Sequence, residues 1–311
     1  MTQTVKIGTR GSKLALYQAN LTKQTLEEKY PDLNFELVII QTKGDQRLDV
    51  SLSKVGDKGF FTKEIERALL DGDIHLAVHS MKDLPTEFPE GLKLGAVLPR
   101  GEVRDALVSN DKRKLSELTE EDIIATSSTR RKAQLLKINP NFKIVDIRGN
   151  VDTRLKKWQS GYCTAMIMAG AGLTRLGYDE HISELLDPMD MPPAPAQGII
   201  AIEIRDGDVE TEKLLQAIND KNTWAMAKTE HTFLAALGGG CQVPIACFSE
   251  INEGQYKLTG TVLSPDGKKH VSGSLEGSIE QSEVSAKTLA NVFMKKGAFK
   301  ILEDFDDSTE K

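Results

Sequence analysis

The stretch that decides the fold reads Val5-Lys6-Ile7-Gly8-Thr9-Arg10-Gly11-Ser12. Residues 5–9 are extended and largely apolar, which predicts a buried strand, and Ser12 is a residue type that caps the first turn of a helix. We therefore expect a helix from Ser12 to about Tyr30. Strand–turn–helix units of this kind, repeated along a chain, are typical of α/β proteins with mainly parallel sheets.

The same alternation continues along the chain and restarts once, after about residue 100. Before the restart we expect strands at residues 35–42, 74–80 and 92–98 and a helix at 61–70. After it we expect strands at 123–126, 144–147 and 164–168 and helices at 130–138 and 151–159. A proline-rich connection at 188–195 then leads to one more strand at 199–204. The pattern predicts two α/β sheets, both mainly parallel.

The pattern changes after Pro244. Helices at about 209–218 and 223–237 come before it. Beyond it, strands at 256–263 and 270–275 are expected to pair antiparallel around the turn Pro265-Asp266-Gly267, and a helix is expected at 281–295. This predicts a small C-terminal α+β domain. The final residues, with Asp304, Asp306, Asp307 and Glu310, predict a solvated acidic tail.

Composition indicates a globular protein and argues against several classes. The chain of 311 residues is 39% hydrophobic and 28% charged, with no apolar run long enough to cross a bilayer and no apolar leader after Met1. Its three cysteines, Cys163, Cys241 and Cys247, do not suggest a disulfide framework, so a reducing cytoplasm is expected. The formal net charge of -6 argues against nucleic-acid binding by the chain as a whole.

Arginines recur where strands give way to helices. The carboxyl ends of strands line the ligand crevice in open α/β sheets, and arginine suits carboxylates and phosphates. A first helical turn favours acids rather than arginines, so these placements run against the local helix rule. The pattern predicts a site for a ligand with several anionic groups, lined by Arg10, Arg130, Arg131, Arg148, Arg154 and Arg175.

A polar cluster ends the expected strand at residues 74–80. Asp83 could act as a general acid or base or stabilise a developing cation, and Lys82 could hold Asp83 ionised or bind an anion. The alternative is an ordinary Lys-Asp turn. His75 and His79 lie too far apart on a strand to chelate one metal, and no metal site is expected.

Two glycine-bearing segments could also serve a ligand. The loop containing Lys54 and Lys58 could close over an anion, or it could be a flexible solvated loop. Gly238-Gly239-Gly240 precedes Cys241, whose thiol could be an attachment point or a nucleophile. The alternative there is a helix C-cap followed by a buried thiol.

These segments together resemble the porphobilinogen deaminase (hydroxymethylbilane synthase) family of tetrapyrrole and haem biosynthesis. The resemblance covers five motifs in family order, with the remainder fitting the family's small cofactor-bearing domain. The motifs are Ile7-Gly-Thr-Arg10-Gly-Ser12-Lys-Leu-Ala-Leu16, His79-Ser-Met-Lys82-Asp83-Leu-Pro85, Thr126-Ser-Ser128-Thr-Arg130-Arg131, Ile147-Arg148-Gly-Asn150-Val-Asp-Thr-Arg154-Leu155 and Leu237-Gly-Gly-Gly-Cys241-Gln-Val-Pro244.

The resemblance implies two periplasmic-binding-protein-like α/β domains plus a small C-terminal α+β domain that carries a covalent dipyrromethane cofactor. The implied domains are residues 1–99 with 199–219, residues 100–198, and residues 220–311. The implied activity is that of a transferase. Four porphobilinogen molecules are joined head to tail, ammonia is released at each condensation, and linear hydroxymethylbilane is freed by hydrolysis.

The resemblance also implies roles for individual residues. Cys241 would hold the cofactor through a thioether, and Asp83 would be the catalytic carboxylate. The leaving nitrogen needs a proton, the azafulvene-type cation needs an anion nearby, and the attacking pyrrole must lose a proton, so one carboxylate could serve all three needs. Cofactor contacts would come from Ser12, Lys82, Ser128, Arg130, Arg131, Arg148 and Arg154. Substrate contacts would come from Arg10, Gln18, Lys54, Lys58, Arg148, Arg175 and Gln197.

The sequence departs from the family pattern at two small residues. Ala196 stands where glycine is common, and Thr129 stands where leucine is common. The resemblance leads us to expect a cytoplasmic monomer that binds no nucleic acid or membrane and hands its product transiently to uroporphyrinogen III synthase. The rival class is a two-domain clamp that binds a polyanion without catalysis. Asp83 and Cys241 discriminate against that class, because a pure anion clamp has no use for a carboxylate in its basic cleft.

Overall fold

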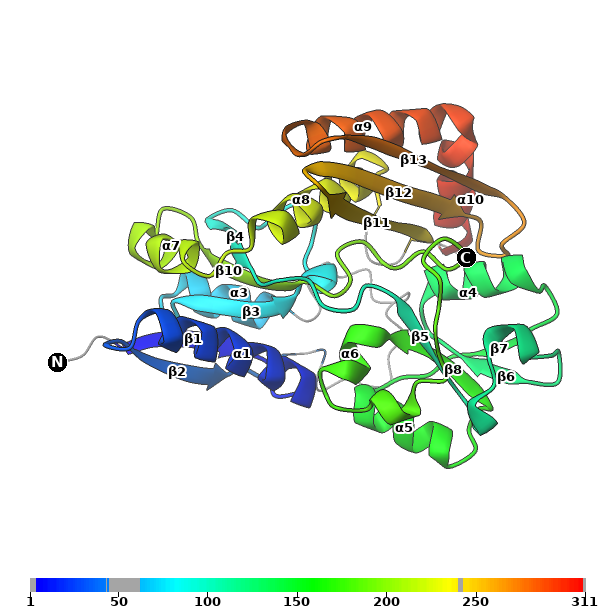
Figure 1. The fold of residues 1–311 in the computed structure, drawn as a ribbon, viewed down its shortest axis with the longest axis horizontal. Helices are drawn as coiled ribbons and strands as arrows, with labels where there is room; N and C mark the ends of the chain where they lie inside the picture. Colours follow the sequence, from blue (N-terminus) through cyan, green and yellow to red (C-terminus); the bar gives the residue numbers. More distant parts are fainter. Residues whose placement is uncertain (1–3, 43, 45–61, 240–242, 310–311) are drawn as a thin grey trace. The chain divides into compact units, whose positions relative to one another are not determined.

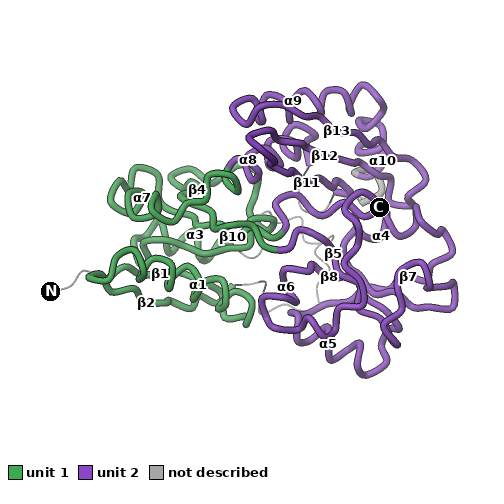
Figure 2. Tube along the Cα trace, in the orientation of Figure 1, with its two compact units in different colours: residues 1–50, 56–101, 198–224 green, residues 51–55, 102–197, 225–311 purple. Residues whose placement is uncertain are grey.

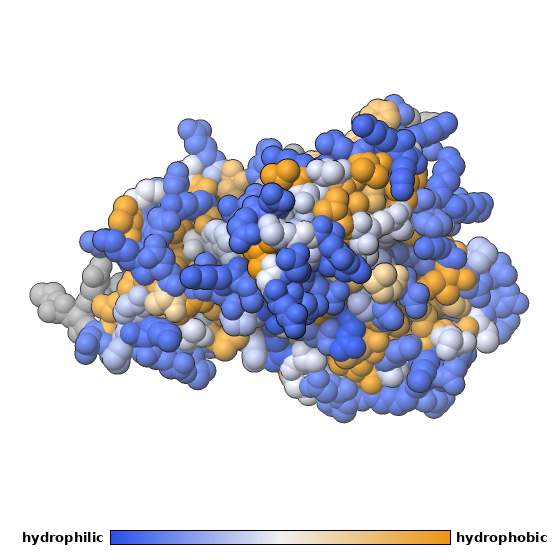
Figure 3. Space-filling model, turned by 45° about the horizontal axis from the view of Figure 1, so that its top comes forward, coloured by the Kyte–Doolittle hydropathy of each residue, from blue (hydrophilic) through white to orange (hydrophobic). Residues whose placement is uncertain are grey.

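The computed structural model describes residues 4–42, 44, 62–239 and 243–309, and Figure 1 labels its helices and strands. The chain divides into two compact units: residues 1–50, 56–101 and 198–224, and residues 51–55, 102–197 and 225–311 (Figure 2). No helix in the described part is both long and apolar enough to cross a membrane. Hydrophilic side chains cover much of the face drawn in Figure 3, with apolar groups between them.

The first unit is built on a five-stranded sheet in the order β2-β1-β3-β10-β4. Alternate residues of a strand point to opposite faces, and the two faces of this sheet carry separate apolar clusters. One face packs against helix α1 (Lys13–Lys29) and α7 (Val209–Gln216), and the other against α3 (Lys63–Leu70). The strands are β1 (Thr4–Thr9), β2 (Asn34–Ile39), β3 (Leu76–Ser80), β4 (Leu92–Val97) and β10 (Ile200–Arg205).

The second unit contains a sheet of the same design, in the order β7-β6-β8-β5-β9. Helix α4 (Thr129–Ile138) packs Leu135 against one face, and α5 (Val151–Gln159) packs Leu155 against the other. The short helix α6 (Gly170–Thr174) follows β8 directly. The strands are β5 (Asp105–Ser109), β6 (Ile123–Ala125), β7 (Lys143–Val145), β8 (Ala165–Ala169) and β9 (Glu184–Leu185).

Each five-stranded sheet contains one reversed strand at the fourth position. β10 pairs antiparallel with both β3 and β4, and β5 pairs antiparallel with both β8 and β9. Both strands come soon after the chain passes from one unit to the other, at residues 101–102 and 197–198. Because neither strand is reached through the helical crossover that joins parallel neighbours, neither is held to the parallel direction. The expectation of mainly parallel sheets is correct except for these two strands.

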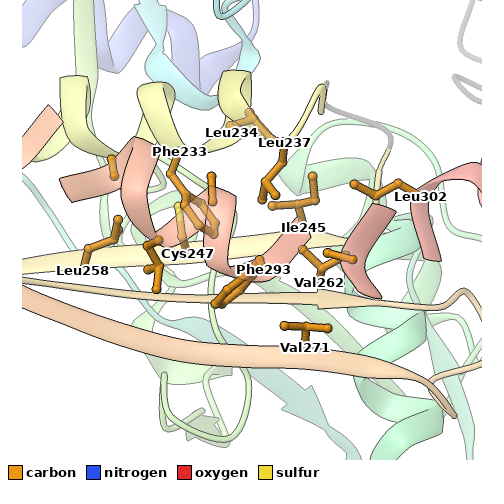
Figure 4. Close-up of a cluster of buried hydrophobic side chains, with 14 of the residues drawn as sticks. Phe233, Leu234, Leu237, Ile245, Cys247, Leu258, Val262, Val271, Phe293 and Leu302 are labelled. Atoms are coloured by element: carbon orange, nitrogen blue, oxygen red, sulfur yellow. The ribbon is translucent and has the colours of Figure 1, made fainter. Parts of the chain in front are cut away.

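The C-terminal part of the second unit is a three-stranded antiparallel sheet, β11-β12-β13. Its core, drawn in Figure 4, includes Phe233 and Phe293, whose rings meet edge to face with centroids 5.5 Å apart. Gly260 lies directly under Phe233, where an added Cβ would come within 2.6 Å of the ring. The elements are α8 (Lys221–Ala236), β11 (Ile245–Asn252), β12 (Gln255–Leu263), β13 (His270–Ser278), α9 (Ser282–Phe293) and α10 (Phe299–Thr309).

The predicted fold class, two α/β domains plus a small C-terminal α+β region, is confirmed by these three sheets. The solvated acidic tail is wrong for residues 299–309, which form helix α10. Ile301, Leu302 and Phe305 recur at helical spacing and are buried, so the apolar positions decide the structure although Asp304 lies between them. Glu310 lies outside the described residues.

The packing of α10 leads to a stability prediction. Ile301 is only 5% exposed and belongs to the C-terminal core, so Ile301→Ala should lower the local free energy of unfolding by about 2–4 kcal/mol. Hydrogen exchange of the β11–β13 amides would measure the loss. Glu303→Ala, at an exposed position of the same helix, is the control and should change stability by less than about 0.5 kcal/mol. Equal exchange in both variants would mean that α10 does not support the core.

Candidate active site

A small pocket in the first unit brings together four of the residues singled out by the sequence. It encloses about 70 Å³ at the carboxyl ends of β1 and β3. These strands are parallel neighbours, with Ile7 opposite Leu76, so the residues that follow them meet at one edge of the sheet. The pocket is lined by Arg10, Ser12, Leu14, Ala15, Gln18, Thr62, His79, Ser80 and Asp83.

Hydrogen bonds fix the polar wall of this pocket. Ser12 caps α1 as predicted, because its hydroxyl accepts from the backbone N–H of Ala15 at 3.3 Å. Gln18, one turn further along the helix, is buried and donates from Nε2 to the Ser80 hydroxyl at 2.9 Å. This bond ties the start of α1 to the end of β3. The remaining polar atoms of Ser12 and Gln18 are thereby held at defined positions in the pocket.

Asp83 is presented by a short turn after β3. Residues Met81–Asp83 form a single 3-10 turn, and the buried side chains of Met81 and Leu84 anchor it on both sides. The Met81 N–H donates to the carbonyl of Ile199 at 3.0 Å, which joins the turn to the start of β10. Asp83 itself is exposed, and Lys82 is partly exposed. The carboxylate is therefore carried on a fixed backbone while remaining accessible from the pocket.

In the second unit, the arginine pair at the start of α4 is buried against a carboxylate that sequence reasoning missed. Arg130 Nη2 and Arg131 Nη2 lie 2.8 Å and 2.7 Å from the two oxygens of Asp105, which is fully buried. Burial alone would raise the pKa of Asp105, but the two guanidinium groups hold it well below its usual range. The only signal in the sequence was an isolated acid at the start of the apolar run Asp105-Ala-Leu-Val.

Gln197 belongs to the same buried group. Its Nε2 donates to Asp105 Oδ1 and to the Val103 carbonyl, both at 2.9 Å. The residue before it, Ala196, has φ +58°, a left-handed conformation that glycine adopts more easily. This geometry explains why glycine is common there in the family. The structure therefore places Gln197, Arg130 and Arg131 together, with all three side chains bound to Asp105.

The other predicted arginines of this unit flank α5 and α6. Asn150 caps α5 by accepting from the Thr153 N–H, and Arg154 donates from Nε to the Gly149 carbonyl at 2.8 Å. Arg148, just before this turn, and Arg154 are both partly exposed. Residues Gly170–Thr174 form helix α6, so Arg175, predicted to lie where a strand gives way to a helix, is instead the C-cap of this short helix.

Three of the residues predicted for the site lie outside the described part of the chain: Lys54, Lys58 and Cys241. The other two cysteines, Cys163 and Cys247, are free and buried. Burial raises the pKa of the Cys163 thiol to about 11, so its thiolate is scarce at neutral pH.

Comparison with known proteins assigns the family. Residues 5–213 match the family model "Porphobilinogen deaminase, dipyromethane cofactor binding domain", and residues 224–295 match "Porphobilinogen deaminase, C-terminal domain". The porphobilinogen deaminase of Syntrophomonas wolfei is 46% identical over 300 residues, which are 96% of this chain and 98% of that protein. The porphobilinogen deaminase of Geotalea uraniireducens is 47% identical over 303 residues, 97% of this chain and 95% of that protein.

Solved structures show a more distant likeness. The effector-binding domain of BenM with benzoate is 18% identical with a TM-score of 0.42, covering 70% of this chain and 90% of that one. A TRAP periplasmic solute-binding protein from Desulfovibrio salexigens is 11% identical with a TM-score of 0.43, covering 72% and 74%. The matches to the two family models, over residues 5–213 and 224–295, and to the two porphobilinogen deaminases, over 96% and 97% of this chain, show that the chain belongs to the porphobilinogen deaminase family.

Proposed function

We propose that Asp83 is the catalytic carboxylate of this enzyme and that the pocket around it receives the reacting porphobilinogen. As a member of its family, the chain joins four porphobilinogen molecules head to tail into hydroxymethylbilane and releases ammonia at each condensation. The main support for the proposal is that one pocket, at the carboxyl ends of β1 and β3, is lined by Asp83, Arg10, Ser12 and Gln18. A carboxylate for proton transfer and a guanidinium for a substrate carboxylate are what this condensation needs.

Asp83 has three tasks in this proposal. It holds a proton near the leaving amine nitrogen, it balances the positive charge that develops as ammonia departs, and it accepts the proton lost from the attacking pyrrole carbon. The anchored turn Met81–Asp83 keeps the carboxylate in place for all three. In this proposal Arg10, which lines the same pocket, and Lys82, which precedes Asp83 in the turn, bind the acetate and propionate groups of the substrate.

The residues at the strand ends also fit the dipyrromethane cofactor of the family. The cofactor carries several carboxylates, and the partly exposed Arg148 and Arg154 lie beside the capped start of α5, where helix N–H groups add to the positive potential. When bound, the cofactor supplies the free pyrrole carbon that starts the chain. We assign its thioether to Cys241 and its carboxylate contacts to Ser12, Lys82, Ser128, Arg130, Arg131, Arg148 and Arg154.

Arg130 and Arg131 can keep this role although they bind Asp105. Two guanidinium groups against one carboxylate leave a net charge of about one positive unit at the start of α4. Ser128, which caps this helix, lies at the same end. We propose that this positive end of α4 attracts the cofactor carboxylates, while Gln197, Arg175, Lys54 and Lys58 serve the growing chain.

The organisation of the chain supports further proposals. The first sheet, the second sheet and the C-terminal sheet each have their own apolar cores, which supports a division into residues 1–99 with 199–219, residues 100–198 and residues 220–311. The free thiols of Cys163 and Cys247 suit a reducing cytoplasm. A monomeric state and the handover of product to uroporphyrinogen III synthase stay predictions from the family resemblance.

The attachment of the cofactor can be tested by mass. Protein purified from a tetrapyrrole-making host should be heavier than its sequence by two porphobilinogen units less two ammonias, and Cys241→Ser should lack this addition. Cys163→Ser and Cys247→Ala are the matched controls and should keep it, because both thiols are buried. An active wild-type protein with the bare mass of its sequence would contradict the assignment.

The role of Asp83 can be tested by single-turnover ammonia release from folded, cofactor-loaded protein. Asp83→Asn keeps the shape but removes the charge and the proton transfer, so release should slow by at least ~10²-fold. Asp83→Glu displaces the carboxylate by one methylene and should be impaired less. Glu87→Gln, an exposed carboxylate four residues further on, is the control. Release by Asp83→Asn at nearly the wild-type rate would remove Asp83 from the mechanism.

We expect some of the arginines to bind the cofactor and others to bind the substrate. Arg154→Leu should lower the fraction of protein that carries the cofactor mass. Arg175→Leu should keep the cofactor but slow later additions, so that enzyme-bound intermediates accumulate in mass spectra. Arg67→Leu removes an exposed arginine of α3 and is the control. A normal cofactor content and a normal ladder of intermediates in both test variants would argue against carboxylate binding by these arginines.

A further inference from the structure

A buried histidine and a buried glutamate meet on the α3 face of the first sheet. His79 Nε2 lies 3.1 Å from Glu203 Oε2, with side-chain exposures of 4% and 0%. The pairing of β3 with β10 places Glu203 opposite Ala77 and His79 opposite Ala201, so both side chains point to the same face. That face is otherwise apolar, with Ile65, Leu69 and Ile74 packed around it.

A second carboxylate joins this pair from helix α3, which packs alongside β3 and β10 (Figure 1). Glu66 is 8% exposed, and its pKa is raised mainly by burial; the Thr62 hydroxyl opposes this, the charge of Glu203 adds to it, and His79 and Lys63 oppose it more weakly. Among the described residues, neither carboxylate oxygen of Glu203 nor His79 Nε2 has a hydrogen-bond partner, so the 3.1 Å contact is a close approach of two titratable groups without the alignment of a hydrogen bond. Two unsolvated carboxylates in an apolar layer are costly unless protons or cations compensate them.

The cluster reaches the pocket that Asp83 lines. His79 and Thr62 form part of the pocket wall together with Arg10 and Asp83. The sequence accounts for this position, because β3 delivers His79, the Ser80 hydroxyl and the turn that carries Asp83 in succession. The charged groups that face His79 or act on its cluster are Glu203 from β10, Glu66 and Lys63 from α3, and Arg10 and Asp83 in the pocket.

We propose that His79 is a positioning residue of the reaction: Glu203 holds it as the imidazolium, and its fixed positive charge in the pocket wall keeps Asp83 ionised between proton transfers. Glu66, whose pKa is raised by burial, lies beside the His79–Glu203 pair in the apolar layer. This inference rests on the proposed role of Asp83. It also explains why two carboxylates, Glu203 and Glu66, lie behind an anion-binding pocket, which packing alone does not explain.

The protonation of His79 is measured first, without reference to turnover. The chain has only five histidines, so labelled imidazole nitrogens can be assigned by comparing the wild type with His79→Gln in NMR spectra. The wild type should show an imidazolium at residue 79 at pH 7, and Glu203→Gln should show a neutral ring there. A neutral His79 in the folded wild-type protein would overturn the proposal. Because this readout does not involve Asp83, it is independent of the ammonia-release test.

The effect on the reaction is measured as the pH dependence of kcat/KM. Loss of the imidazolium from the pocket wall makes Asp83 easier to protonate, so the acidic limb should move to higher pH, by less than about one unit because the neighbouring Glu203 charge offsets part of the effect. His79→Gln and Glu203→Gln should shift the acidic limb by the same amount. The double variant should show no larger shift, because each substitution by itself already removes the imidazolium.

Two variants separate this role from a structural one. The double variant His79→Gln/Glu203→Gln leaves no unpaired charge in the sheet, so it should fold even where His79→Gln alone does not. Glu66→Gln keeps the shape of the side chain and leaves both His79 and Glu203 in place, and it should leave the acidic limb within about 0.2 unit of wild type. An unchanged pH profile in the folded double variant, or an equal shift in Glu66→Gln, would overturn the proposal.

Discussion

The buried ion group of Asp105, Arg130 and Arg131 is the constraint on which the second unit depends. Asp105 begins β5, the reversed strand, and the two arginines begin α4, so the group fixes the helix against the sheet. Arg131 also donates to the Ile167 carbonyl on β8, and Arg130 to the Pro192 carbonyl. Charges taken out of water are stable only when such partners surround them. The group therefore determines where β5, β8, α4 and the following connection lie relative to one another.

A second buried carboxylate fixes the same connection from its other side. Glu230 on α8 accepts the N–H of Ala196 at 2.6 Å and both the N–H and the hydroxyl of Ser249 on β11. The Cys247 N–H donates to the Pro193 carbonyl. Residues 192–197 are thus held by polar groups of the α4 region and of the C-terminal sheet. The left-handed conformation of Ala196 is tolerated because its N–H is taken by Glu230, which offsets the strain of a non-glycine residue.

The sequence predicts most of the fold because periodicity and capping are local properties. The helix from Ser12, the strand before Ser80 and the hairpin at Pro265-Asp266-Gly267 are all where the pattern places them. The failures are non-local. The sequence pattern predicts no element at β5, whose first residue, Asp105, is stabilised by the distant Arg130 and Arg131. It predicts a solvated tail at α10, because the C-terminal core that receives Ile301 is also built from distant residues.

The candidate site is predictable to the same extent. Arg10 and Asp83 are each singled out in the sequence by their position after a strand, and the parallel pairing of β1 with β3 in the structure brings them to one pocket. The partners of Arg131 and Gln197 could not be predicted in this way. They depend on a third residue, Asp105, that lies 26 positions from Arg131 and 92 from Gln197 in the chain.

The buried carboxylates of this protein have two kinds of environment, one expected of groups that stabilise the fold and one that packing does not explain. Asp105 and Glu230 are surrounded by guanidinium, amide and hydroxyl donors, which is the arrangement expected of groups that hold elements together. Glu203 lacks a hydrogen-bond donor among the described residues, and its charged neighbours are the His79 imidazole and the Glu66 carboxyl. A carboxylate kept for stability alone gains nothing from that environment, because an apolar residue of similar volume would fill the space at lower cost. What distinguishes Glu203 is its neighbour, since His79 borders the pocket of Asp83, and in our proposal the charge that Glu203 holds on His79 acts on that carboxylate.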